Sequence, residues 1–307
     1  MEASIALKNI TKRFGSKTVL QQVSFGVEKG TTLSIVGPGA AGKTTLLQIL
    51  TGLTRPDDGA VYIRGMNLAE NLRHIKKRIG YMPETDALNL DATLLQNLQM
   101  SGIFCGMKLR DASARASQYL EEYHLLEYSH NYPDEVSASV RRRFTFIRAI
   151  LPDPEILLLD APLANNDYST RKRIWEYVRS GRGEKTVVIT HRDMSEAEPH
   201  ADRIIYLEQG KIITDGSPAK LRENAELTTE YILRFRELQP EYYEQLRSMR
   251  EVVDIEQHEL TVVLRLKEPA AFQRIIQDYE SVLQDHRVHE LSLNEVLFEF
   301  PHIQLGV

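Results

Sequence analysis

The chain has 307 residues, of which 42% are hydrophobic and 26% are charged, and its formal net charge is −5. This composition excludes intrinsic disorder and collagen-like structure, and the length leaves room for about two domains. The acidic balance argues against nucleic-acid binding across the whole surface. No run approaches the roughly 18 consecutive apolar residues of a membrane-spanning helix, so any membrane role is expected to depend on a partner chain.

The first part of the chain has the turn residues and short apolar runs of β-strands. We predict strands at residues 5–8, 23–27, 32–36 and 61–64. Further along, helical periodicity alternates with short buried runs. Helices are predicted at residues 92–104, 111–122, 141–151 and 169–179, and strands at residues 79–82, 156–160, 186–190 and 203–207. This alternation indicates an α/β fold with a mostly parallel sheet covered by helices.

A second pattern follows Gly210, Gly216 and Pro218. After a polar helix at residues 219–224, the sequence predicts a strand–helix–strand–strand–helix–strand order. Its elements are expected at residues 231–235, 241–249, 252–257, 260–266, 270–278 and 286–291. We therefore expect two domains, residues 1–220 and a small α/β domain at residues 221–307.

A phosphate-binding motif of the form G-x-x-x-x-G-K-[ST] follows the apolar strand at residues 32–36. It consists of Gly37, Pro38, Gly39, Ala40, Ala41, Gly42, Lys43 and Thr44, and a helical run begins at Thr45. Small residues let backbone N–H groups turn toward a phosphate, and the helix N-terminus favours the negative charge. Lys43 would reach the β- and γ-phosphates, and the Thr44 hydroxyl would bind Mg²⁺. The alternative is a glycine-rich turn with an incidental lysine.

The buried strand predicted at residues 156–160 ends in a single carboxylate, Asp160. In phosphate-loop proteins such a carboxylate emerges beside the loop and holds Mg²⁺. Together, the two motifs predict a binding site for a nucleoside triphosphate with Mg²⁺.

The motifs in their order resemble the ATP-binding subunit of an ABC transporter over roughly the first 220 residues. The resemblance implies a P-loop NTPase cassette with a mixed core sheet, an antiparallel β subdomain and a helical subdomain. Residues 79–84 match the Q-loop region, residues 136–140 the signature position, and residues 190–191 the H-loop. The tail from residue 221, including residues 292–297, is similar to the accessory domain of some export-type cassettes.

The resemblance also implies roles for single residues. Phe14 would stack on adenine, Ser137 would contact a phosphate across a cassette dimer, and His191 would sense the γ-phosphate. Glu84 would bind the metal. Each residue also has an ordinary structural interpretation, since Phe14 could be a half-buried strand aromatic and His191 a hydrogen-bonded loop histidine.

Four positions depart from the family pattern. The glutamate that activates water is replaced by Ala161, and the signature reads Val-Ser-Ala-Ser-Val at residues 136–140. The Q-loop glutamine is Glu84, and Ala40 stands where a glycine is usual. A general base contributes about 10²–10⁴ in rate, so we expect slow hydrolysis on this chain's own phosphate loop. Glu84 could act as a substitute base.

The expected assembly contains a transmembrane permease and a second cassette, with the chain on the cytoplasmic face of the membrane. A competent, different cassette is favoured over an identical one, because the two defects would then fall on opposite composite sites. The basic run at residues 141–143 is interpreted as a solvated helix, with no nucleic-acid partner. Alternatives left open are a non-hydrolysing regulatory subunit, a soluble ABC-type protein outside transport, and a small-molecule kinase.

Overall fold

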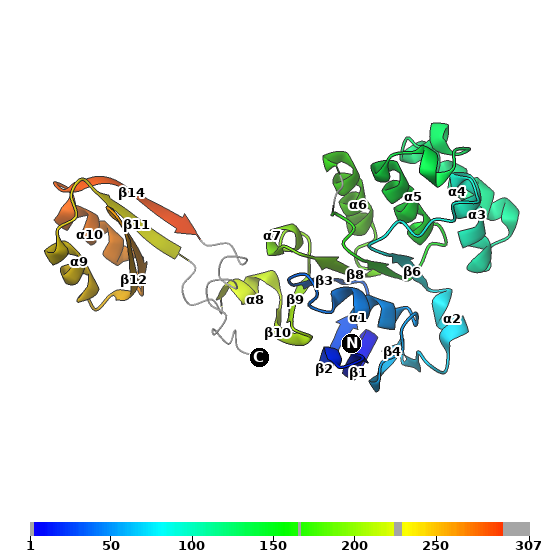
Figure 1. The fold of residues 1–307 in the computed structure, drawn as a ribbon, viewed down its shortest axis with the longest axis horizontal. Coiled ribbons are helices and arrows are strands. Elements are labelled where there is room, and N and C mark those ends of the chain that lie inside the picture. Colours follow the sequence, from blue (N-terminus) through cyan, green and yellow to red (C-terminus); the bar gives the residue numbers. More distant parts are fainter. Residues whose placement is uncertain (1–2, 165–166, 224–228, 291–307) are drawn as a thin grey trace. The chain divides into compact units, whose positions relative to one another are not determined.

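A computed structural model describes residues 3–164, 167–223 and 229–290. The chain divides into two compact units, Met1–Pro218 and Ala219–Val307, which we describe separately. The first unit contains two sheets and the helices around them (Figure 1).

The first unit contains a four-stranded antiparallel sheet in the order β2-β1-β4-β5. Its strands are β1 (Ala3–Phe14), β2 (Lys17–Glu28), β4 (Asp58–Ile63) and β5 (Met66–Asn67). The first two strands are longer than predicted, because they pair with each other from Ala3 opposite Glu28 to Phe14 opposite Lys17. Backbone pairing therefore extends well beyond the short apolar runs that the sequence displays.

A six-stranded sheet in the order β10-β9-β3-β8-β7-β6 forms the centre of this unit. Its strands are β3 (Thr32–Val36), β6 (Ile79–Met82), β7 (Ile156–Leu159), β8 (Thr186–His191), β9 (Arg203–Glu208) and β10 (Lys211–Gly216). The pairs within β9-β3-β8-β7-β6 are parallel, which confirms the predicted mostly parallel sheet. Only β10, which was not predicted, runs antiparallel to its neighbour at the sheet edge.

The helices of the first unit match the predicted long helices and add shorter ones. They are α1 (Lys43–Leu50), α2 (Leu72–Lys76), α3 (Leu94–Phe104), α4 (Leu109–Glu122), α5 (Ala138–Ile150), α6 (Tyr168–Ser180) and α7 (Met194–Ala197), with 3₁₀ turns η1 (Leu126–Tyr128) and η2 (Pro133–Glu135). The boundary between the two units falls after the first residue of α8 (Pro218–Glu223). The helix predicted at residues 141–151 begins earlier, because the Ser137 hydroxyl accepts a bond from the Val140 N–H and caps α5. The short helices α2 and α7 are too brief to show a helical period.

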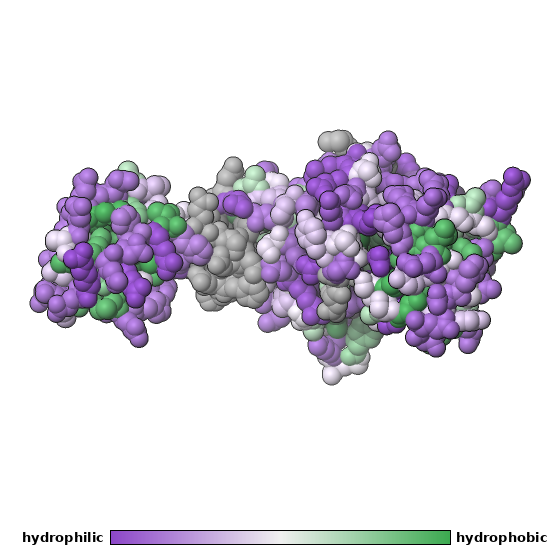
Figure 2. Space-filling view, turned by 90° about the horizontal axis from the view of Figure 1, so that it is seen from above, coloured by the Kyte–Doolittle hydropathy of each residue, from purple (hydrophilic) through white to green (hydrophobic). Residues whose placement is uncertain are grey.

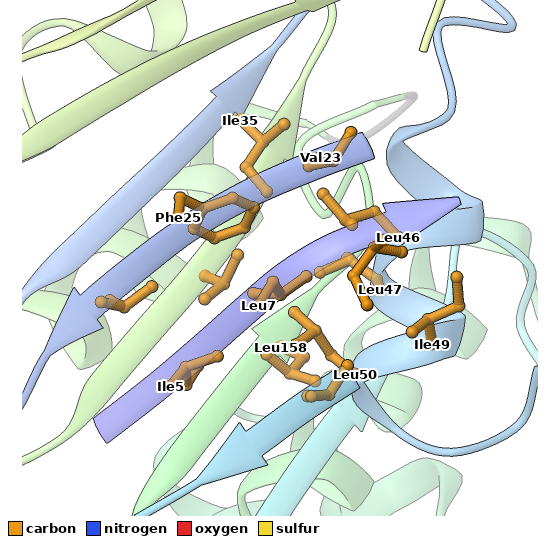
Figure 3. Packing of buried hydrophobic residues seen from close by; sticks show 14 of the residues in the cluster. Ile5, Leu7, Val23, Phe25, Ile35, Leu46, Leu47, Ile49, Leu50 and Leu158 are labelled. Atoms are coloured by element: carbon orange, nitrogen blue, oxygen red, sulfur yellow. The ribbon is translucent and has the colours of Figure 1, made fainter. Parts of the chain in front are cut away.

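One hydrophobic core joins the two sheets through α1. Leu46, Leu47 and Leu50 on α1 are fully buried between residues of the antiparallel sheet, such as Ile5, and residues of the central sheet, such as Leu158. Figure 3 shows these side chains pointing toward one another. Since α1 follows the phosphate-binding motif directly, this packing holds the motif in a fixed position. Truncating a buried leucine of this kind costs about 2–5 kcal/mol of stability.

The second unit has the predicted strand–helix–strand–strand–helix–strand order. Its elements are β11 (Thr229–Phe235), α9 (Pro240–Arg247), β12 (Val252–His258), β13 (Thr261–Leu266), α10 (Ala270–Tyr279) and β14 (Leu283–Glu290). The strands form an antiparallel sheet in the order β12-β13-β11-β14, a split βαβ arrangement with its own core. The expectations for residues 224, 291 and 292–297 lie outside the described residues.

The surface of the first unit is mostly hydrophilic on the face that Figure 2 presents, with hydrophobic residues gathered in a few separate areas. Within the described ranges of the chain, none of the helices has the length and hydrophobicity needed to span a bilayer.

Candidate nucleotide-binding site

The phosphate-binding motif forms a turn between the fully buried strand β3 and α1. Gly42 has a φ of 108°, and a Cβ at this position would lie 2.9 Å from the carbonyl oxygen of Val19. A Cβ on Gly37 would lie 2.0 Å from the carbonyl oxygen of Leu207, so both positions require glycine. Ala40 also adopts a positive φ, 62°, which is strained for a residue with a Cβ.

Lys43 lies at the centre of the site. Its Nζ donates to the carbonyl oxygens of Gly37 at 2.6 Å and Pro38 at 2.8 Å. Burial lowers the pKa of the ammonium, and the positive charge of Arg192 lowers it further, while Asp160 and Glu84 raise it. Lys43 therefore interacts electrostatically with Arg192, Asp160 and Glu84, while its ammonium is hydrogen-bonded to carbonyl oxygens of its own loop.

Asp160 directly follows β7 and is 1% exposed. Its Oδ1 accepts a hydrogen bond from the Thr190 hydroxyl at 2.8 Å, whereas its Oδ2 is buried without a hydrogen bond among the residues that the structure describes. Burial raises the pKa of this carboxyl, opposed by the hydroxyls of Thr190 and Thr44. A buried carboxylate oxygen without a partner, beside a hydroxyl, is a suitable donor set for Mg²⁺, which prefers oxygen ligands.

The position after Asp160 lines the same pocket but offers only a methyl group. Ala161 has a φ of 44°, and its N–H donates to the Thr190 hydroxyl at 2.8 Å. The buried Arg142 holds this turn by donating to the carbonyl oxygens of Asp160 at 3.0 Å and Ala161 at 3.1 Å, and it also donates to Pro83. Sequence reasoning missed this arginine, since it assigned the run at residues 141–143 to a solvated helix face; the 6% exposure of Arg142 corrects that interpretation for this residue.

The structure brings most of the predicted residues into one pocket of about 280 Å³. Its predicted lining residues are Phe14, Gly39, Ala40, Ala41, Gly42, Lys43, Thr44, Thr45, Glu84 and Asp160. Phe14 is 52% exposed, and the Lys12 Nζ lies 5.2 Å from its ring centroid. One face of the ring is therefore engaged by a cation.

Four predicted residues, Gly37, Pro38, Ser137 and His191, are not among the described residues that line this pocket. Ser137 is the N-cap of α5 and is exposed. His191 is 1% exposed and stacks on Trp175 with ring centroids 5.8 Å apart, and its Nδ1 lies 3.6 Å from Glu196 Oε2. Burial lowers the pKa of this histidine.

Two residues that flank His191 line the pocket in its place, namely Thr190 and Arg192. Arg192 Nη2 lies 3.2 Å from Glu84 Oε1, so the two form an ion pair. Neither residue was predicted to have a role in the site, although Thr190 belongs to the H-loop match. A strand places alternate residues on the same side, which groups Thr190 with Arg192, but β8 is buried throughout and has no apolar–polar alternation to show which side faces the pocket.

Comparison of the sequence with known proteins identifies the family of the chain. The sequence model of the ABC transporter family matches residues 20–164. The chain is 38% identical over 224 residues to a Nod factor export ATP-binding protein I from Burkholderia lata, covering 72% of this chain and 73% of that protein. It is 34% identical over 220 residues to a protein of the same description from Rhizobium etli, covering 71% and 69%.

The chain belongs to the ATP-binding subunits of ABC transporters. As a member, it is an ATP-binding cassette of a transport system, and such subunits dimerise and pair with transmembrane permeases. The predicted cassette fold is confirmed.

Solved structures agree with this assignment. The ATP-binding cassette MJ0796, solved as a dimer bound to ADP and Pi, superposes with a TM-score of 0.63 at 27% identity, covering 70% of this chain and 98% of that one. An ATP-binding subunit of an ABC transporter superposes with a TM-score of 0.67 at 23% identity, covering 71% and 92%, which shows the fold alone.

Proposed function

We propose that this cassette binds MgATP and hydrolyses it slowly, in a transporter whose turnover depends on a second, competent cassette. The observation that carries the proposal is Ala161, which lines the pocket next to Asp160 and has no group that can orient or deprotonate water. Loss of a general base lowers a rate by about 10²–10⁴.

The proposed site divides its work among residues from different elements. The loop N–H groups and Lys43 would hold the phosphates, Phe14 would stack on the base through the ring face away from Lys12, and Thr44, Asp160 and Glu84 would provide oxygen ligands for Mg²⁺. The metal would neutralise phosphate charge. His191, which lies within electrostatic reach of Lys43, would sense the γ-phosphate.

Glu84 is a poor substitute for the missing base in the arrangement observed. A base must be free to accept a proton from water in a defined position. Glu84 Oε1 is paired with Arg192 Nη2 at 3.2 Å, and a carboxylate that binds Mg²⁺ cannot at the same time accept a proton from water. We therefore assign Glu84 to metal binding rather than to catalysis.

The partner cassette is proposed to be a different chain. In a head-to-tail dimer the altered signature at residues 136–140 would serve the partner's nucleotide, while Ala161 affects the nucleotide on Lys43. With an identical partner, both composite sites would carry both defects. With a competent partner, one site would retain a base, and hydrolysis would occur there. The same observation favours a second candidate, a subunit whose ATP is never hydrolysed in any assembly.

A groove beside α2 and α3 supports the proposed permease contact. It is a cavity of about 500 Å³ lined by the exposed apolar side chains of Leu53 and Phe104, 62% and 82% exposed, and by three basic residues. These basic residues are Arg73, Lys76 and Lys77. Exposed apolar side chains beside positive charge suit a partner segment that is amphipathic and acidic.

Location, direction and domain roles follow as proposals from the same assignment. The cassette would lie on the cytoplasmic face of the membrane, bound through its permease. Export is the proposed direction, supported by the names of the relatives from Burkholderia and Rhizobium. We propose residues 1–220 as the cassette and residues 221–307 as an accessory domain.

The decisive experiment measures binding and turnover separately. The purified chain is expected to bind MgATP, as measured by calorimetry, with turnover at least about 10²-fold below that of a competent cassette, because the general base is absent. Lys43→Ala should abolish binding. Ala161→Glu should raise turnover in an assembly that contains the permease and the second cassette.

Three outcomes would contradict parts of the proposal. Fast hydrolysis by the purified chain that Lys43→Ala abolishes would overturn the slow-turnover assignment. If Glu84→Gln removed that activity, Glu84 would be the base. If the complete assembly with permease and second cassette bound ATP without turnover, the second candidate, a purely regulatory subunit, would be the correct one.

A further inference from the structure

Arg192 occupies a position in the pocket that the sequence pattern assigns to no function. It directly follows β8, lines the pocket, and its side chain is 69% exposed. Its contact within the site is the ion pair with Glu84, in which Nη2 lies 3.2 Å from Oε1. A long, exposed guanidinium on one carboxylate is free to exchange that partner for another anion.

Arg192 belongs to the same charge cluster as the lysine of the phosphate loop. The pKa of Lys43 responds to Arg192, Asp160 and Glu84, so these three groups lie within electrostatic reach of Lys43. The positive charges of Lys43 and Arg192 offset the negative charges of Asp160 and Glu84. A polyphosphate would bring several negative charges to it and would compete with Glu84 for the guanidinium.

The cluster is built around the lysine of the phosphate loop. Phe14 and Lys17, which also line the pocket, are paired residues of the β1–β2 hairpin. Arg192 and Thr190 come from the end of β8, where Thr190 bonds Asp160. Because the lysine of this motif reaches the β- and γ-phosphates, a cation beside it on the Asp160 side faces the terminal phosphate.

We propose, on the basis of the proposed function, that Arg192 is a specificity-determining residue that leaves Glu84 and binds the terminal phosphate of a nucleoside triphosphate. Guanidinium groups form two parallel hydrogen bonds to phosphate, whereas Glu84 takes one in this structure. A diphosphate lacks this phosphate and leaves the ion pair intact. The cassette thereby binds ATP more tightly than ADP, although it lacks the general base that hydrolysis of ATP requires.

The test compares the affinities of ATP and ADP for the full chain in EDTA, by displacement of a fluorescent nucleotide. Arg192→Ala is expected to weaken ATP binding about tenfold, the size of one charge-assisted hydrogen bond, and ADP binding less than about twofold. The ATP affinity of Arg192→Lys should lie between the affinities of the unaltered chain and of Arg192→Ala. The matched control is Arg274→Ala, which removes an exposed arginine paired with Glu251 in the second unit and should change neither affinity.

A second variant separates phosphate contact from simple release of a repelling carboxylate. If Arg192 binds phosphate, the Arg192→Ala, Glu84→Gln double variant should remain about tenfold weaker for ATP than Glu84→Gln alone. Full recovery of ATP affinity in the double variant would overturn the proposal, because Arg192 would then only mask Glu84.

The remaining outcomes are also decisive. Equal loss of ATP and ADP affinity, or no loss, would overturn the role of Arg192 while leaving the cassette's nucleotide binding in place. Absence of any nucleotide binding by the unaltered chain would overturn the proposed function together with this inference.

Discussion

His191 and Arg192 are neighbours in the chain with opposite surroundings. His191 is buried against Trp175, whereas Arg192 lines the candidate nucleotide-binding pocket. Every residue of β8 is buried, so the strand shows no alternation of apolar and polar residues from which the facing side could be read. The H-loop match predicted a functional role for this part of the chain, but only the packing against Trp175 showed that Arg192, and not His191, lines the pocket.

The ring contacts of Trp175, the only tryptophan in the chain, predict that its fluorescence depends on pH. The rings of Trp175 and His200 lie 4.0 Å apart between centroids. Burial, and secondarily Arg179, lowers the pKa of His200 from its ordinary value of 6.5. Since a protonated imidazole quenches indole fluorescence, emission should fall on acidification with a midpoint below 6.5.

A fluorescence titration checks this prediction, with His200→Gln expected to remove the step and the exposed His258 as a matched control. His258→Gln should leave the titration unchanged. Folding lowers the pKa of His200, so the unfolded chain binds more protons than the folded chain. The free energy of unfolding should therefore fall as the pH drops below about 6.5. A midpoint at or above 6.5 would contradict the burial argument.

Among the elements, α5 and α6 are connected at their N-termini through one carboxylate. Asp167 is the N-cap of α6, and its side chain accepts from the Thr170 N–H at 2.8 Å and from the Ser139 hydroxyl at 2.8 Å in the first turn of α5. The segment at the signature position is therefore tied to the helix that follows Ala161. The start of α6 was predicted to within one residue, whereas the start of α5 was predicted three residues too late, because capping depends on contacts between distant segments.

Replacing this cap is expected to destabilise the first unit. Asp167→Ala should lower the free energy of unfolding by about 1 kcal/mol, because an unsatisfied helix N–H replaces a capped one. The hydroxyl of Ser169 and the N–H of Thr170 hold the pKa of the Asp167 carboxyl well below its usual range, so the cap's contribution is present above pH 4 and is lost on further acidification.

Urea unfolding followed by Trp175 fluorescence measures this loss, since Trp175 lies on α6. Asp167→Asn is the control, because asparagine is an equally good N-cap residue and should retain most of the stability. Equal destabilisation by alanine and asparagine would assign the effect to charge instead of capping.

For the whole molecule, the presence of two compact units predicts that ATP stabilises one of them directly. Trp175 reports the unfolding of Met1–Pro218, which contains the pocket. ATP at 100 times its dissociation constant should raise the free energy of unfolding of this unit by about 2.7 kcal/mol, if the unfolded chain does not bind ATP. Lys43→Ala should abolish the shift, and a shift that survives this substitution would place ATP elsewhere.

The sequence alone determined the cassette fold, the phosphate loop, Asp160 and the absence of a carboxylate at Ala161. The phosphate loop and the strand that ends at Asp160 and Ala161 are short contiguous stretches, so the local sequence determines their backbone and chemistry. The order of these motifs along the chain indicated the cassette fold. Only the tertiary structure decided that Arg142 is buried under the Ala161 turn, that Glu84 pairs with Arg192, and that His191 packs against Trp175. Such contacts join segments as much as 108 residues apart, and they depend on how sheets and helices pack rather than on spacing along the chain.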